Sequence, residues 1–136
     1  MDEDLCRCAE IISLFEKLDI AHRNHLDYLK RGTLDVAWMP LPGKNSWAVL
    51  TKDKAQMLIP LELENIIKHE LGRFAFSSGN FTGAEMAKML EKHLRSMDNI
   101  MRGEYRPFCY TIGKESLSRR KIQLPAGFVP TRKGWW

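Results

Sequence analysis

The chain has 136 residues, of which 44% are hydrophobic and 28% are charged, and its formal net charge is +4. These values are ordinary for a soluble globular domain with one core. No apolar run approaches the ~20 residues that span a bilayer, and the acidic N-terminus lacks the basic region of a signal peptide, so we expect a cytoplasmic protein without a membrane segment. The odd number of cysteines, Cys6, Cys8 and Cys109, fits reduced thiols better than a disulfide framework.

The positive charge is concentrated at the C-terminal end. From Gly113 onward the only acidic residue is Glu115, and this segment carries +5, against about −1 for residues 1–112. We therefore predict a domain over residues 1–112 and a basic, irregular tail over residues 113–136. Such a tail suggests an anionic partner such as nucleic acid, but it also fits a solubilising segment or one that folds onto an acidic protein.

The first half of the chain contains three patterns. Residues 5–18 repeat apolar side chains at spacings of three and four, which predicts an amphipathic helix. Residues 34–41 favour a short helix before a Pro-Gly turn at residues 42–45. Residues 47–51 are apolar and β-prone, which predicts a buried strand that ends just before Asp53.

Helices and strands continue to alternate in the second half. We expect a helix over residues 58–71, with Pro60 in its first turn and Gly72 as its C-terminal stop. A strand at residues 73–77 and a loop follow, and Thr82 and Glu85 form a capping box for a helix that runs to about Arg102. Its methionine stripe is typical of a core face. With a last strand at residues 107–112, this alternation predicts an α/β fold with a parallel sheet.

Three groups of acidic residues are candidates for chemistry. They are Asp2 with its neighbours before the first helix, Asp35 before the short helix, and Asp53 past the end of a strand. Carboxylates that converge in a fold can hold Mg²⁺ or Mn²⁺, ions that suit phosphodiester hydrolysis. The alternatives are that the first group caps a helix and that Asp53 is a turn residue.

A zinc site is the weaker metal hypothesis. Cys6 and Cys8 are followed by His22 and His25, but the C-x-C and H-x-x-H spacings differ from those of structural zinc sites.

The order of these motifs resembles that of the PIN-like domains, and especially of the VapC-type toxin nucleases. The matching stretches are D-E-D-L at residues 2–5, H at 25 leading to G-T-L-D-V-A-W-M-P at residues 32–40, L-T-K-D-K at 50–54, P-L-E-L at 60–63 and S-G-N-F-T-G-A-E-M at 78–86. Together they cover about residues 2–112. The resemblance implies a three-layer PIN-like fold with a central, mostly parallel sheet. In the family a hydrophobic first strand precedes the first acid, and here we expect that strand to be missing or truncated.

The resemblance also implies a function: a metal-dependent ribonuclease paired with a neutralising antitoxin. Carried over by position, Asp2, Asp35 and Asp53 would be the catalytic, metal-binding acids, and Mg²⁺ or Mn²⁺ the cofactor. Lys52, Lys54 and Asn80 would contact RNA, and Thr82 is better explained as the helix cap. The resemblance suggests a homodimer. The alternative is a non-catalytic PIN-like module that binds a partner protein.

Overall fold

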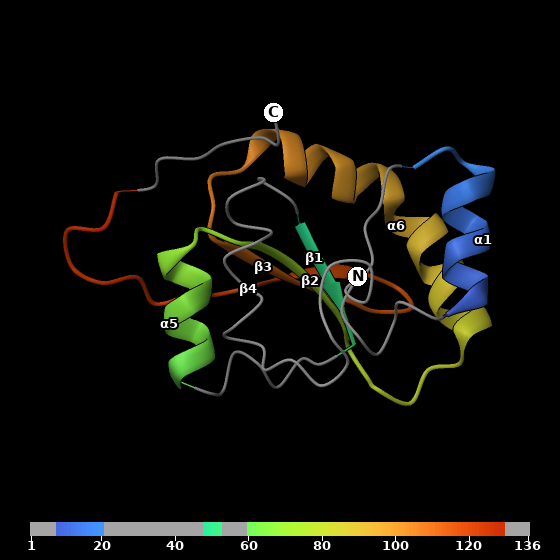
Figure 1. Cartoon of the computed structure of the whole chain (residues 1–136), viewed down its shortest axis with the longest axis horizontal. Helices are drawn as coiled ribbons and strands as arrows, with labels where there is room; N and C mark the ends of the chain where they lie inside the picture. Colours follow the sequence, from blue (N-terminus) through green and yellow to red (C-terminus); the bar gives the residue numbers. More distant parts are fainter. Residues whose placement is uncertain (1–7, 21–47, 53–59, 130–136) are drawn as a thin grey trace, which may run out of the picture.

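The computed structural model describes residues 8–20, 48–52 and 60–129 (Figure 1). The elements follow in the order α1 (Ala9–Lys17), β1 (Ala48–Thr51), α5 (Pro60–Lys68), β2 (Gly72–Phe76), α6 (Gly83–Gly103), β3 (Phe108–Ile112) and β4 (Leu117–Arg120). In these segments, no helix is both long and apolar enough to cross a membrane.

The four described strands form one sheet in the order β1-β2-β3-β4. The first three are parallel, because a helix follows β1 and another follows β2, and each returns the chain to the start of the next strand. β4 is antiparallel to β3, to which a short turn joins it. The prediction of an α/β fold with a mostly parallel central sheet is confirmed.

Helices lie on both faces of this sheet, which makes three layers (Figure 1). α1 packs along α6, and together they cover the face formed by Phe74, Phe76 and Tyr110. α5 lies on the other face, where Ile66 and Leu71 pack with apolar side chains of β1 and β3. All five residues of β2 are buried, as expected for a parallel strand covered on both faces of the sheet.

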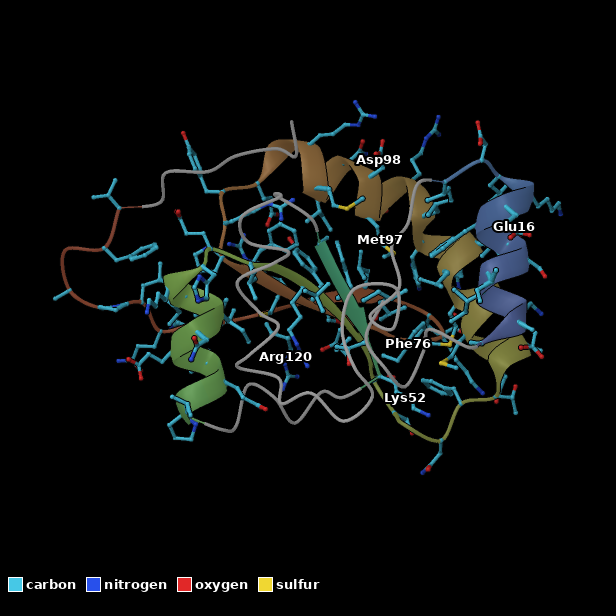
Figure 2. All side chains as sticks on the ribbon, in the orientation of Figure 1. Glu16, Lys52, Phe76, Met97, Asp98 and Arg120 are labelled. Carbon is cyan, nitrogen blue, oxygen red and sulfur yellow. The ribbon has the colours of Figure 1, made fainter. Side chains whose placement is uncertain are left out.

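The larger core lies between the sheet and the α1–α6 pair. Phe74 and Phe108 meet edge to face with their ring centroids 5.5 Å apart. The Phe108 ring lies over Gly72, where an added Cβ would be 2.4 Å from the ring, so the close packing of β2 and β3 requires glycine there. The methionine stripe of α6 is core as predicted, with Met86, Met89 and Met97 buried; Met97 points from α6 to the sheet and Asp98 away from it (Figure 2).

The capping box of α6 is confirmed. The Glu85 N–H donates to the Thr82 hydroxyl at 3.1 Å, and the Thr82 N–H donates to the Glu85 carboxylate at 2.9 Å. These two bonds satisfy donors that the first turn of a helix otherwise leaves unpaired.

We predicted a helix over residues 58–71 that ends at Gly72, and this end was wrong. α5 ends at Lys68, and Glu70 takes the left-handed conformation with φ 49°. The Leu71 N–H then donates to the Ile66 carbonyl and the Glu70 N–H to the Ile67 carbonyl, the pattern of a Schellman motif. Gly72 instead begins β2.

α1 ends in the same way. Asp19 has φ 54°, the Ile20 N–H donates to the Phe15 carbonyl at 2.8 Å, and the Asp19 N–H donates to the Glu16 carbonyl at 3.2 Å. Both helices therefore reverse through a left-handed residue that is not glycine.

The expectation of an irregular tail from residue 113 was wrong for residues 117–120, which form β4. The Leu-Ser-Arg-Arg sequence has little strand character of its own. It becomes a strand because the turn after Ile112 places it against the free edge of β3, where Ile112 pairs with Leu117 and Cys109 with Arg120.

Candidate functional site

The candidate site lies at the edge of the sheet where the parallel strands end. Thr51, Phe76 and Ile112 are the last residues of β1, β2 and β3. The register pairs Thr51 with Ala75 and Phe76 with Ile112, so the three strands end nearly level. In open α/β sheets, ligands bind at this edge.

Lys52 directly follows β1 and is half-buried. Thr51 before it is fully buried, and Lys52 lies just past the end of the strand, toward the same end of the sheet as Phe76 (Figure 2). The sequence prediction placed Lys52 beyond the end of this strand, and the structure agrees.

The loop after β2 brings a second candidate to the same edge. Ser77 follows the strand and its N–H donates to the Ile112 carbonyl at 2.9 Å, which ties the start of this loop to the end of β3. Asn80 is exposed, and its backbone N–H donates to the Ser78 hydroxyl at 3.1 Å. The loop conformation is thus fixed from within, while the Asn80 amide faces solvent.

Lys114 lies at the same edge of the sheet, although the sequence analysis did not place it in the site. Lys114, in the turn between β3 and β4, lies 3.1 Å from the Glu85 carboxylate and 5.7 Å from the centre of the Phe81 ring. The Thr82 backbone N–H, and after it the Lys114 ammonium, lower the pKa of the Glu85 carboxyl. The signal in the sequence was the position of Lys114, two residues past the end of a strand, like that of Asp53.

The turn that carries Lys114 is itself anchored to α6. The buried His93 donates through Nε2 to the Gly113 carbonyl at 2.8 Å, and Lys92 donates to the Lys114 carbonyl at 3.0 Å. Lys92 also lies 3.5 Å from the Glu115 carboxylate. The end of β3, the N-terminal half of α6 and the loop after β2 are therefore held as one unit.

The N-terminus of α6 points to this edge, but its surroundings are already acidic. A Cβ added at Gly83 would collide with the Glu10 carboxylate of α1, and Cys8 lies 3.5 Å from the same carboxylate. Glu10 and Glu85 thus occupy the place where a phosphate would profit from the helix dipole. The N-terminus of α6 is therefore a poor place for a further anion.

The proposed metal ligands are not among the residues that the structure describes. Asp2, Asp35, Asp53 and Lys54 lie outside the described residues, as do Cys6, His22 and His25. Within the described ranges, no three His, Cys, Asp or Glu side chains group closely enough to hold a metal ion. Of the six predicted site residues, the structure places Lys52 and Asn80, and it places both at one edge of the sheet.

Comparison with known proteins identifies the family. Searches among curated proteins and among solved structures gave no match. The family model described as PIN like domain matches residues 1–78. This region includes α1, β1, α5 and β2, and it contains every predicted site residue except Asn80. Because the match covers more than half of the chain, and because the described strands form a mostly parallel sheet between helices, the chain belongs to the PIN-like domain family.

Proposed function

We propose that the protein is a metal-dependent endoribonuclease of the VapC toxin type, which hydrolyses RNA phosphodiesters. The observation that carries this proposal is the family match, which runs through the strand that leads to Lys52 and Asp53. Two further observations support it: β1 and β2 end at one edge, and the residues that follow them, Lys52 and Asn80, include a cation and an exposed amide.

The proposed donor set fits the proposed cofactor. Asp2, Asp35 and Asp53 supply only carboxylate oxygens, the ligands that Mg²⁺ and Mn²⁺ prefer. When bound, such an ion activates water and neutralises negative charge at the phosphodiester. The role of the three aspartates in the proposal is to hold that ion and to orient the scissile phosphate.

The neighbouring side chains would bind the RNA strand. Lys52 and Lys54 flank Asp53 in the sequence, and their ammonium groups would bind the phosphates on either side of the cleaved bond. The Asn80 amide can donate and accept hydrogen bonds, which suits contact with a ribose hydroxyl or a base edge.

The toxin assignment implies a partner. In this proposal a cognate antitoxin neutralises the ribonuclease, two copies of the chain form a homodimer, and both proteins act in the cytoplasm. An adjacent open reading frame for a small DNA-binding protein would support the pairing with an antitoxin, and its absence from the locus would count against it.

The test of the nuclease is cleavage of RNA by the purified full chain with Mn²⁺, with Mg²⁺ and with EDTA. We expect cleavage that requires the metal and that falls at least about 100-fold in Asp53→Asn, because the loss of a metal ligand should cost at least as much as the loss of its supporting partners. The matched control is Asp98→Asn, which removes an exposed carboxylate of α6 paired with Arg102 and should leave the rate unchanged.

The second candidate function is a non-catalytic PIN-like module that binds a partner protein. The basic strand β4 at the outer edge of the sheet is the observation that favours it. In the same assay this function predicts no metal-dependent cleavage and no difference between the wild-type chain and Asp53→Asn.

A further inference from the structure

In the described part of the chain, β4 is the last strand of the sheet and no strand pairs with its outer edge. The Gly113 N–H donates to the Ser116 carbonyl at 2.9 Å, which makes these two residues a hydrogen-bonded pair. Because such pairs alternate along an antiparallel ladder, the backbone groups of Ser118 and Arg120 face β3 and those of Leu117 and Arg119 face outward. Among the described residues, none forms a backbone hydrogen bond to this outer edge.

The side chains along this edge carry one sign of charge. Arg119, Arg120 and Lys121 follow one another, and residues 116–136 contain no acid. The Arg119 guanidinium lies 3.6 Å from the Glu104 carboxylate, whereas no described carboxylate forms an ion pair with Arg120, labelled in Figure 2, or with Lys121. Residues 118–121 are exposed. Within the described residues, the edge therefore combines backbone groups that have no strand partner with excess positive charge.

These two properties together indicate which kind of partner fits the β4 edge. A second copy that paired through its own β4 would bring the cations of both copies close together, and like charges on facing strands are unfavourable. A nucleic acid would satisfy the side chains but not the alternating N–H and C=O groups of the edge. An extended acidic peptide satisfies both, because its backbone continues the ladder and its carboxylates meet the cations.

We propose that the β4 edge binds an extended acidic segment of a partner protein, which adds to the sheet as a strand beside β4. This binding surface is separate from the C-terminal edge of the parallel strands, where Lys52 and Asn80 lie, and it does not depend on nuclease activity.

The first experiment uses synthetic peptides as probes of the full chain. A fluorescent ten-residue peptide of alternating Glu and Val should bind, as measured by anisotropy. A Lys-Val peptide should bind at least about tenfold more weakly because its charge is reversed. A Glu-Val peptide that is N-methylated at alternate residues should also bind at least about tenfold more weakly, because it cannot form the backbone hydrogen bonds of an added strand. If N-methylation has no effect, the contact is charge alone and the proposal is wrong.

Amide hydrogen exchange gives a residue-specific readout. On addition of the Glu-Val peptide, exchange should slow at Leu117 and Arg119, whose N–H groups face outward, and stay unchanged at Ser118 and Arg120, which already bond to β3. Equal slowing at all four amides, or slowing elsewhere only, would contradict strand addition. If a twelve-nucleotide RNA protects this edge and the peptide does not, the surface binds nucleic acid instead.

Two substitutions at one position separate backbone from charge. Arg119→Gln removes the cation and keeps the N–H, whereas Arg119→Pro removes both; the ladder to β3 survives because that N–H faces outward. We expect affinity in the order wild type, Gln, Pro, and no loss in the control Arg95→Gln, which removes an exposed cation of α6. Equal affinity of Gln and Pro variants would overturn the proposal; if the Pro variant does not fold, the N-methylated peptide decides.

Discussion

The hydroxyl of Tyr110 links the end of α6 to the sheet. It donates to the Glu104 carboxylate at 2.5 Å, and Arg119 approaches the same carboxylate from β4. Burial, and then the hydrogen bond to Glu104 and its charge, raise the pKa of Tyr110 to about 12. The Glu104 carboxylate, at the C-cap of α6, therefore contacts side chains of both β3 and β4.

The raised pKa of Tyr110 predicts a pH dependence of stability. Because the folded chain holds this proton more tightly than the unfolded chain, its stabilisation is complete below pH 10 and is lost as the pH rises from 10 to about 12. Tyr110→Phe should lower the free energy of unfolding by about 1–2 kcal/mol at pH 7 through the lost hydrogen bond. Above pH 10, the free energy of unfolding of the variant should decrease less steeply with pH than that of wild type.

Urea unfolding at several pH values measures both effects. Burial raises the pKa of Cys109 to about 11 and adds its own loss of stability at high pH, but it does so in wild type and variant alike. The difference between the two proteins therefore isolates Tyr110. Parallel curves from pH 8 to 12 would show that the phenol does not titrate as described.

At the scale of the element, the end of α1 depends on the left-handed conformation of Asp19. A β-branched side chain in that conformation clashes with the backbone, so Asp19→Val should destabilise the protein by about 1–2 kcal/mol. Asp19→Gly should be at least as stable as wild type, because glycine adopts positive φ without this cost. Asp19 is exposed, so few packing changes obscure the comparison. Equal thermal unfolding temperatures for Val and Gly would contradict the reversal of the chain at this residue.

Elements with a strong local signal were predicted from the sequence to within one or two residues. The capping box begins α6, and the apolar runs at β2 and β3 define strands. The end of α5 was mispredicted because a glycine normally stops a helix, whereas here Glu70 does so two residues earlier. β4 was missed because its strand structure comes from pairing with β3, a contact that no local pattern encodes.

The same distinction applies to the candidate site. Lys52 and Asn80 were predictable because each follows a recognisable strand, and parallel strands end at one edge. Lys114 was assigned to a tail because its contacts with Phe81 and Glu85 depend on the turn between β3 and β4. The roles of Asp2, Asp35 and Asp53 stay predictions, since these residues lie outside the described part of the chain.

At the scale of the whole molecule, β4 extends the packed structure beyond residue 112. Leu117 packs against the larger core, Ile122 packs against the smaller one, and β4 covers the edge of β3. A chain that ends at residue 112, the boundary predicted from the sequence, loses these contacts. We expect it to be unfolded or to lose at least about 3 kcal/mol of stability, given the buried area and ladder removed.

The matched control for this truncation is a chain that ends at residue 129, which keeps every described contact. Circular dichroism and urea unfolding compare the two. If the chain that ends at residue 112 unfolds like the control, residues 113–129 are an appendage and the predicted boundary is right.

The turn at residues 113–116 connects β4 to α6 and to the loop that follows β2. His93 and Lys92 of α6 form hydrogen bonds to the backbone of this turn. Lys114 in the turn contacts the Phe81 ring, in the loop that also contains Asn80. The turn also connects β3 to β4. A displacement of β4 would therefore reach the loop that follows β2 through this turn. If a partner protein binds β4 as proposed, this turn is the route by which its binding would affect the loop of Asn80 without direct contact.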